Sequence, residues 1–464
     1  MALIKSISGI RGTIGGKIND NLTPIDAVKF AAAYGTWLQS QYNNKQSLTV
    51  VVGRDARISG KMISSLVCET LLSLGINVID LGLSTTPTVE MAVTLEHAHG
   101  GIIITASHNP KQWNALKLLN HKGEFLNDKE GTKVIEIAEA EAFEFAQVDD
   151  LGTYRKKADY INKHINEVLK LKLVDVEAIK NAKFKVIVDA VNSTGGIAIP
   201  ALLEKLGVTC VALYCEPNGQ FPHNPEPLPA HLTEISKWVV QEHANLGIVV
   251  DPDVDRLALV NEDGSMFGEE YTLVACADYV LQNTPGNTVS NLSSSRALRE
   301  ITIKHGGNYQ ASAVGEVNVV ALMKKNKAVI GGEGNGGIIY PELHYGRDSL
   351  VGVALFLSHL AHKNMSCSQL RASYPNFFMS KNKIDLTADI DVDAILKKMA
   401  KKYENEQIST IDGVKIDFET EWAHLRKSNT EAIIRIYTES TSEEKAEALA
   451  LKIINDIKLI ASIK

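Results

Sequence analysis

The sequence predicts an α/β fold of three tandem repeated α/β domains, followed by a smaller C-terminal α+β domain. Three observations lead to this prediction. Short apolar runs bounded by Gly, Pro, Asn and Asp alternate with longer amphipathic stretches, which is the pattern of βα units. One order of segments returns three times along the chain, and the pattern changes after about residue 360. The length of 464 residues suits about three or four domains, which implies clefts between them.

The repeat consists of strand-like runs that end in polar loops. The first segment contains SLTVVVGRDARISG, GINVIDLG and GGIIITASHNP; the second contains FKVIVDAVNSTGG, GVTCVALYCEP and LGIVVDPDVDR; the third contains GNTVSNLSSSRALRE, GGNYQASAVGE and KAVIGGEGNGG. Any α/β protein places strands and helices in series, so the order alone is weak evidence. The chemistry of the loops strengthens it.

The C-terminal part has a different pattern. NKIDLTADIDVDAILKKMAKKYENEQ is rich in lysine, and GVKIDF, WAHLRKS and EAIIRIYTES alternate as half-exposed antiparallel strands do. The final helix is expected to begin with Thr441 as its N-cap and Glu444 at the capping-box position. We expect four domains, at residues 1–148, 149–255, 256–366 and 367–464.

The composition excludes several classes of protein. Apolar residues make up 45% of the chain and charged residues 22%, which excludes disordered and collagen-like chains. The formal net charge of −7 argues against general binding to nucleic acid or anionic membranes, so an anionic ligand needs its own arginines. The five cysteines lack a zinc-binding spacing, and no apolar run approaches the ~18 residues of a membrane span. We expect a cytoplasmic protein with neither nucleic-acid nor membrane partners.

Ser107 follows a run of three isoleucines and precedes His108 and an Asn-Pro turn. The carboxyl end of a strand in an α/β sheet is where such folds bind ligands, so this serine has the position of a nucleophile. A serine that caps a helix is the ordinary alternative. The surroundings do not match G-x-S-x-G, so a hydrolase nucleophile elbow is not indicated. His108 could be a base, an oxyanion donor or a loop residue.

Three carboxylates follow the strand-like run LGIVV in the segment DPDVDR. Residues two apart lie on one face of an extended segment, so Asp251, Asp253 and Asp255 would repel one another unless a cation lay between them. Hard oxygen ligands suit Mg²⁺. The spacing to Glu262 imitates an EF-hand, but Arg256 stands where that loop needs glycine. An aspartyl-phosphate phosphatase and a solvated acidic turn are the remaining alternatives.

Two further loops carry polar groups. In GGEGNGG, Glu333 and Asn335 offer an acceptor and an amide for sugar hydroxyls, although glycine-rich turns are common. RKSNTEAIIR offers a guanidinium, hydroxyls and backbone N–H groups, which suit a phosphate, or else form an ordinary turn with surface arginines. Its candidate residues are Arg426, Ser428, Asn429, Thr430 and Arg435. The four loops together predict phosphoryl transfer between sugar hydroxyls.

The same segments resemble those of the α-D-phosphohexomutase family. SGIRGTIG, TASHNPKQWNALKLL, DPDVDR, GGEGNGG and RKSNTEAIIR occur in the family's order over nearly the whole chain. The resemblance implies three tandem repeated α/β domains with mixed sheets plus a smaller C-terminal α+β domain around a central cleft. It also implies an isomerase that interconverts hexose 6-phosphates and hexose 1-phosphates, with small-molecule sugar phosphates as partners, as a monomer or homodimer.

The resemblance assigns roles to individual residues. Ser107 would carry the phosphoryl group and would hold Mg²⁺ together with Asp251, Asp253 and Asp255, with a hexose 1,6-bisphosphate as activator. Arg11 would stabilise the transferring group, and Lys117 and His108 would be the general acid/base candidates. The residues expected to bind substrate are Arg256, Glu333, Asn335, Arg426, Ser428, Asn429, Thr430 and Arg435.

The chain departs from the family pattern at two places. Many members end the sugar loop with Ser-Gly-His, where this chain has Asn335, Gly336 and Gly337, and often carry proline where this chain has Ala432. The segments GEGNGG, VGEVNV and YGRDSL most resemble the phosphoglucosamine mutase-related branch, so we expect glucosamine 6-phosphate as substrate, with phosphoglucomutase/phosphomannomutase activity as the alternative. A metal-dependent sugar phosphatase and a sugar-phosphate sensor are more distant alternatives.

Overall fold

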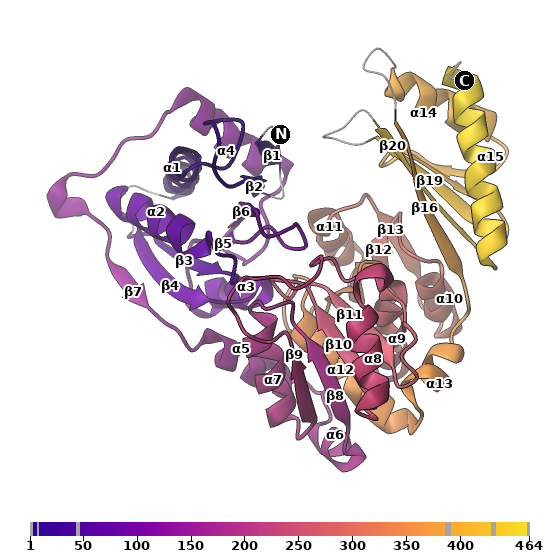
Figure 1. The fold of residues 1–464 in the computed structure, drawn as a ribbon. Coiled ribbons are helices and arrows are strands. Elements are labelled where there is room, and N and C mark those ends of the chain that lie inside the picture. The colour runs from indigo at the N-terminus through magenta and orange to yellow at the C-terminus, as the bar shows by residue number, and fades with distance from the viewer. Residues whose placement is uncertain (1–2, 7–8, 43–46, 386–390, 428–432, 462–464) are drawn as a thin grey trace.

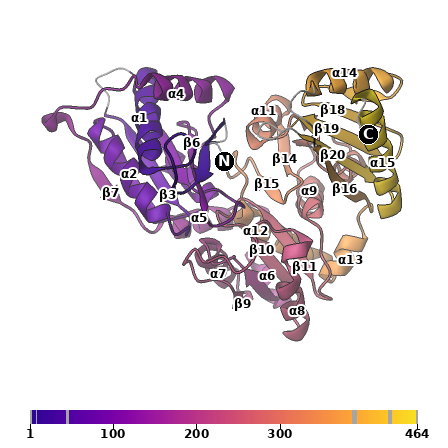
Figure 2. The same ribbon diagram turned by 45° about the horizontal axis from the view of Figure 1, so that its top comes forward.

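The structure is a computed structural model that describes residues 3–6, 9–42, 47–385, 391–427 and 433–461. Within these ranges the strands form four sheets, one for each of four domains (Figure 1). The second and third domains lie together below, whereas the first and fourth stand on either side above them (Figures 1 and 2).

The first sheet has seven strands in the order β1-β2-β6-β5-β3-β4-β7. At its centre β3 pairs in parallel with β4 and β5, and β6 returns antiparallel to β5. Alternating side chains of β3 reach the two faces, since Val50 and Val52 pack under α1, α2 and α4, while Val51 packs under α3. The strands are β1 (Ile4–Ser6), β2 (Gly9–Thr13), β3 (Thr49–Arg54), β4 (Asn77–Leu83), β5 (Gly100–Ile104), β6 (Trp113–Leu119) and β7 (Tyr154–Lys156), and the helices are α1 (Pro24–Gln41), α2 (Gly60–Ser73), α3 (Thr86–Leu95) and α4 (Asp128–Ala140).

The second and third sheets repeat the central topology of the first. In each, the first strand is parallel to the second and third, and the fourth is antiparallel to the third. The strands of the second sheet are β8 (Lys185–Asp189), β9 (Thr209–Leu213), β10 (Leu246–Val250) and β11 (Leu257–Asn261); those of the third are β12 (Asn287–Asn291), β13 (Tyr309–Ser312), β14 (Ala328–Glu333) and β15 (Gly337–Ile339). The predicted tandem repeat with mixed sheets is therefore confirmed.

The second and third domains share one hydrophobic core. The helix α12 lies within it and is buried from Ser349 to Leu360. It packs against α5, α6 and α7 on one side and against α9 on the other. The helices of these domains are α5 (Tyr160–Leu169), α6 (Val176–Ala182), α7 (Gly195–Lys205), α8 (Thr233–Gln241), α9 (Glu269–Asn283), α10 (Ala297–Lys304), α11 (Glu316–Asn326), α12 (Ser349–Lys363) and α13 (Cys367–Ala372), with 3₁₀ turns at Val148–Asp150 and Pro229–His231.

The fourth domain is the predicted α+β unit with its own core. Its antiparallel sheet has the order β16-β20-β19-β18-β17, and α14 and α15 pack against it. Its elements are β16 (Phe378–Asp385), α14 (Val392–Lys402), β17 (Gln407–Ser409), β18 (Val414–Asp417), β19 (Trp422–Lys427), β20 (Ile433–Ser440) and α15 (Glu443–Ala461). The N-cap contact of α15 differs from the expected one by one residue, because the Lys445 N–H donates to Ser442 Oγ.

Two strands cross the expected domain limits. β7 follows residue 148 yet pairs with β4 of the first sheet, and β11 follows residue 255 yet pairs with β10 of the second. β11 completes the antiparallel edge of its sheet, so residues 251–256 lie inside the second domain and not at its end. Among the described residues, no helix is long and apolar enough to cross a membrane.

Candidate active site

The three polar loops occupy equivalent positions in the three repeats. Each connects the third, parallel strand to the fourth, antiparallel strand: residues 105–112 join β5 to β6, residues 251–256 join β10 to β11, and residues 334–336 join β14 to β15. They meet across the domains, because Ser107 Oγ of the first loop donates to Asp251 Oδ2 of the second at 2.7 Å, and the N–H of Leu257, directly after the second loop, donates to the Gly336 carbonyl of the third at 3.0 Å. The sheet ends therefore converge on one place.

Ser107 lies at the tip of the first loop with its hydroxyl turned toward the second domain. Its backbone is left-handed, with φ of 49°, and its Oγ donates a hydrogen bond to Oδ2 of Asp251 at 2.7 Å. His108 Nδ1 is 3.3 Å from the same Oγ. Burial, together with the charges of Arg256 and Arg11, lowers the pKa of His108 well below its usual range, so its ring is neutral at pH 7.

The three carboxylates of the second loop are completely buried, and their ligand atoms lie within 4.8 Å of one another. Cations and donors from neighbouring domains surround them. Lys117 Nζ is 2.7 Å from Asp253 Oδ2 and 3.4 Å from Asp255 Oδ2, and Thr86 Oγ1 donates to Asp253 Oδ2 at 2.6 Å. Buried Oδ1 of Asp253 and of Asp255 accept no hydrogen bond from the described residues.

The charges of this cluster are strongly coupled. Burial and repulsion by Asp253 and Asp255 raise the pKa of Asp251 well above its usual range. Burial would also raise the pKa of Asp253, but the Lys117 cation outweighs it and the pKa is lowered. Likewise burial opposes the charge of Lys117, but the two aspartates raise its pKa above the usual range. Three hard oxygen ligands, two of which have a buried atom without a hydrogen-bond partner among the described residues, fit a divalent cation such as Mg²⁺.

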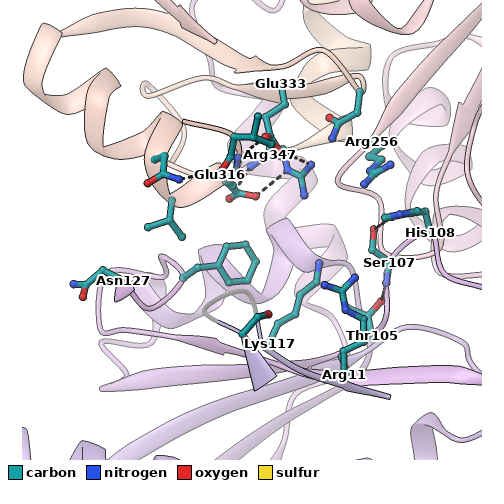
Figure 3. Close-up of a pocket in the computed structure, with 18 of the residues that line it drawn as sticks. Arg11, Thr105, Ser107, His108, Lys117, Asn127, Arg256, Glu316, Glu333 and Arg347 are labelled. Carbon is teal, nitrogen blue, oxygen red and sulfur yellow. Dashed lines mark hydrogen bonds and ion pairs between the residues drawn. The ribbon is translucent and has the colours of Figure 1, made fainter. Parts of the chain in front are cut away.

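A second charged group faces Ser107 across the cleft (Figure 3). It is centred on Arg347, whose Nη2 donates to Asp255 Oδ2 at 2.7 Å, whose Nε donates to Glu316 Oε2 at 2.9 Å and whose Nη1 is 3.0 Å from Glu333 Oε2. Burial and the negative charges of Asp255 and Glu333 raise the pKa of Glu316 to about 7, although the Arg347 cation opposes this shift. Arg347 thus connects the carboxylates of the second loop with the sugar loop.

The cleft between these groups has a volume of about 850 Å³ and receives side chains from all four domains. The sequence-predicted residues that line it are Arg11, Ser107, His108, Lys117, Arg256, Glu333, Asn335 and Arg435. Arg426 is not among the lining residues, and its Nε lies 2.9 Å from Asp412 Oδ2. Ser428, Asn429 and Thr430, as well as Ala432, lie outside the described residues.

Comparisons with known proteins decide the family. Four domain signatures of phosphoglucomutase/phosphomannomutase match in order: alpha/beta/alpha domain I at residues 3–145, domain II at 158–264, domain III at 268–377 and the C-terminal domain at 382–455. The chain belongs to the phosphoglucomutase/phosphomannomutase family. The second signature ends at residue 264, so it includes β11, as the observed sheet does.

Relatives within the family differ in the sugar that their names specify. A phosphoglucomutase/phosphomannomutase of Thermococcus kodakarensis is 36% identical over 96% of this chain and 98% of its own. A phosphoglucosamine/phosphogalactosamine mutase of Sulfurisphaera tokodaii is 31% identical over the full length of both chains. The α-D-phosphohexomutases are isomerases of the phosphotransferase type, and this chain is one of them.

Solved structures support the fold. A phosphoglucomutase/phosphomannomutase family protein of Burkholderia thailandensis superposes with a TM-score of 0.84, at 24% identity over 98% of both chains. An N-acetylphosphoglucosamine mutase of Aspergillus fumigatus, described in complex with GlcNAc-6P and magnesium, has a TM-score of 0.55 at 14% identity and covers 90% of this chain and 84% of that one.

Arg57 is a residue of this mutase that the sequence analysis did not single out. It is buried, and its guanidinium holds the serine loop by donating to main-chain carbonyls. Nη2 donates to the carbonyls of Ser107 and Asn109, and Nη1 donates to that of Pro110 at 2.7 Å. Its Nε is 3.0 Å from Asp55 Oδ2, and Asp55 in turn accepts from the Thr105 hydroxyl. The only signal in the sequence is that Asp55 stands two residues before Arg57 in GRDARISG, at the end of the first strand of the repeat.

Replacing Arg57 by lysine tests this function of Arg57. Lysine keeps the charge beside Asp55 but cannot make the forked contacts, so buried carbonyls lose donors at about 1–3 kcal/mol each. We expect R57K to lower the mutase kcat by roughly 10- to 100-fold, with a smaller change in KM. The matched control R54K alters a half-buried arginine three residues away and should keep most of the rate. Unchanged turnover in R57K would show that the serine loop does not need the hydrogen bonds from the Arg57 guanidinium.

Gly337 stands where many family members have histidine, and the structure gives a reason. A Cβ at Gly337 would lie 2.3 Å from Cδ of Arg347, so any side chain there would displace the arginine. The sequence features that could have indicated this contact are Gly337 itself and the segment YGRDSL, which contains Arg347. The glycine therefore leaves room for the Arg347 side chain.

We therefore expect G337A to act through Arg347. The substitution should lower kcat/KM by at least about 10-fold, which corresponds to a loss of about 1.4 kcal/mol of transition-state stabilisation. In an R347A background the same substitution should cause no further loss, because the side chain that it displaces is gone. Additive losses in the double variant would instead place the effect of G337A elsewhere in the sugar loop.

Proposed function

We propose that this mutase interconverts hexose 6-phosphate and hexose 1-phosphate through a phosphorylated Ser107, and that glucosamine 6-phosphate is its preferred substrate. The observation that carries the reaction is the Ser107 hydroxyl, which points at three buried carboxylates at the edge of a cleft lined by four domains. A nucleophile beside a metal site, with arginines in the same cleft, suits phosphoryl transfer.

The chain's own residues account for each part of the reaction. Asp251, Asp253 and Asp255 would hold Mg²⁺ with the serine, and the ion supplies charge stabilisation for the transferring phosphoryl group when bound. Arg11, whose Nη1 donates to Asn109 Oδ1 at 3.1 Å, lies at the serine loop and lines the cleft, so its guanidinium can stabilise the transferring group. The P–O bond to Ser107 Oγ breaks as a bond to the sugar oxygen forms.

Two groups are placed to move protons. His108 is neutral and lies 3.3 Å from Ser107 Oγ, so it can accept a proton. Lys117, which carries its proton beside Asp253 and Asp255, is the second candidate for general acid/base catalysis. The second half of the reaction runs in the opposite sense after the bisphosphorylated sugar has turned over in the cleft, and a hexose 1,6-bisphosphate is the activator that phosphorylates Ser107.

The remaining cleft residues bind the substrate. Glu333 and Asn335 receive sugar hydroxyls, while Arg256 and Arg435 offer guanidinium groups to the phosphate that does not react. Arg426, Ser428, Asn429 and Thr430 belong to the same proposed phosphate loop of the fourth domain.

Two carboxylates that the third domain contributes to the cleft support the preference for an amino sugar. Glu316 and Glu333 both line the cleft, and they share a single arginine, Arg347. An ammonium group on the sugar would supply the cation that this pair lacks. Several relatives at 29–32% identity are named as probable phosphoglucosamine mutases, whereas a relative at 36% identity is named as a phosphoglucomutase/phosphomannomutase.

A coupled assay tests the reaction. The purified protein with Mg²⁺ and a trace of hexose 1,6-bisphosphate is offered glucosamine, glucose and mannose 6-phosphates in parallel, and both 1-phosphates and free phosphate are measured. We expect 1-phosphates without free phosphate, and at least about a 10³-fold loss of rate in S107A. S65A, which removes an exposed hydroxyl, is the matched control. Steady phosphate release without isomerisation would indicate a phosphatase.

Replacing Glu316 by glutamine tests the sugar preference. Glutamine keeps the size of the side chain and a hydrogen-bonding group but removes the charge that an ammonium would meet. Because hydrogen bonds between charged groups contribute about 1.5–3 kcal/mol, kcat/KM for glucosamine 6-phosphate should fall roughly 10- to 100-fold further than that for glucose 6-phosphate. Equal losses for both sugars would show that Glu316 only positions Arg347.

A further inference from the structure

A second group of metal-binding side chains lies at the junction of the first three domains, away from the aspartate cluster. His164 comes from α5, and His344 and Asp348 come from the segment between β15 and α12. Nε2 of His164 is 2.9 Å from Asp348 Oδ2, and Nε2 of His344 is 3.3 Å from the same oxygen. One ligand atom from each of the three residues lies within 4.8 Å of the other two, and His164 and Asp348 are fully buried.

The opposite atoms of these side chains are fixed by other groups. Oδ1 of Asp348 accepts from the Leu350 N–H at 2.8 Å and so caps α12, which leaves Oδ2 for the two imidazoles. Nδ1 of His164 is 2.9 Å from Thr88 Oγ1 on α3. These contacts orient the two rings and the carboxylate so that Nε2 of each histidine lies at Oδ2 of Asp348.

Glu90 supplies an independent observation. Its side chain is 2% exposed, and neither carboxylate oxygen has a hydrogen-bond partner among the described residues. Its Oε2 lies 3.5 Å from Nδ1 of His344. A carboxylate behind the outer nitrogen of a histidine is the arrangement that orients metal-bound imidazoles and makes them more basic. Both histidines thus have an outer partner, Thr88 for one and Glu90 for the other.

We propose that His164, His344 and Asp348 form a site for a transition-metal ion of the Zn²⁺ type, separate from the aspartates. Two imidazole nitrogens and one carboxylate oxygen are ligands that Zn²⁺ accepts, whereas Mg²⁺ prefers oxygen atoms alone. Ligand atoms about 2.0–2.1 Å from a tetrahedral Zn²⁺ stand roughly 3.3 Å apart, which is near the spacings seen here. Each neutral ring would bind the ion through the lone pair of Nε2 and carry its proton on Nδ1, beside Thr88 Oγ1 in His164 and Glu90 Oε2 in His344, and any second proton would be released to solvent.

A metal ion at this site would connect the first three domains, which surround the cleft. His164 belongs to the second domain, His344 and Asp348 to the third, and the outer partners Thr88 and Glu90 to α3 of the first. Asp348 directly follows Arg347, and α3 begins at Thr86, whose hydroxyl holds Asp253. A metal at the junction therefore fixes two segments that contact the aspartate cluster, without touching the substrate cleft.

The test measures metal binding by the full-length protein and needs no enzyme assay. After treatment with a chelator, Zn²⁺ uptake is measured by equilibrium dialysis in a large excess of Mg²⁺, which fills the aspartate site. We expect one equivalent of Zn²⁺ per chain, a higher thermal midpoint in its presence, and visible absorption when Co²⁺ replaces Zn²⁺. H164Q and H344Q should no longer bind this equivalent of Zn²⁺, and E90Q should lower the affinity for Zn²⁺ by roughly 10- to 100-fold.

The matched control is H121Q, which changes an exposed histidine and should keep the equivalent. X-ray absorption of the zinc-loaded wild-type protein gives a reading that does not depend on variants folding, and two imidazoles in the first shell are expected. Uptake below one equivalent, uptake unchanged in H344Q, or a shell of oxygens alone would overturn the proposal and leave these residues as a hydrogen-bond network between domains.

Discussion

Asp251, Asp253 and Asp255 place three carboxylates, none exposed to solvent, with ligand atoms within 4.8 Å of one another. At an effective dielectric constant of about 20, each pair of full charges at that separation repels by roughly 3–4 kcal/mol. The chain reduces this repulsion with Lys117 from the first domain and Arg347 from the third, and with a raised pKa for Asp251. The same electrostatic requirement that makes a cation favourable therefore also draws the domains together around Ser107.

The repeated topology explains how residues so far apart in sequence reach one place. In each of the first three domains the loop after the third parallel strand carries the polar residues, and the antiparallel fourth strand returns the chain to the core. Three copies of one motif thereby bring Ser107, the three aspartates and Glu333 with Asn335 to the same cleft. The fourth domain has a different sheet and a separate core, and contributes Arg435 to the cleft.

The sequence was sufficient for the fold class and for the residues that follow strands, because strand ends in an α/β sheet meet at one edge. It did not reveal Arg57, which acts on main-chain carbonyls, or the contacts of Arg347, which pairs with side chains from three distant segments. The expected limit at residue 255 differed from the sheet because β11 pairs with the strand before the loop. Arg426 was expected in the cleft, but its guanidinium lies beside Asp412, a partner with no signal in the sequence.

The central claim is that Ser107 carries the phosphoryl group between substrates. The most direct measurement is to incubate the protein with Mg²⁺ and hexose 1,6-bisphosphate labelled in its phosphates, to map the labelled residue by mass spectrometry, and to follow the label after adding unlabelled hexose 6-phosphate. The account predicts one labelled phosphoryl group per chain, on Ser107, which passes to the sugar within a turnover. Label on an aspartate, or on Ser107 but passing only to water, would contradict it.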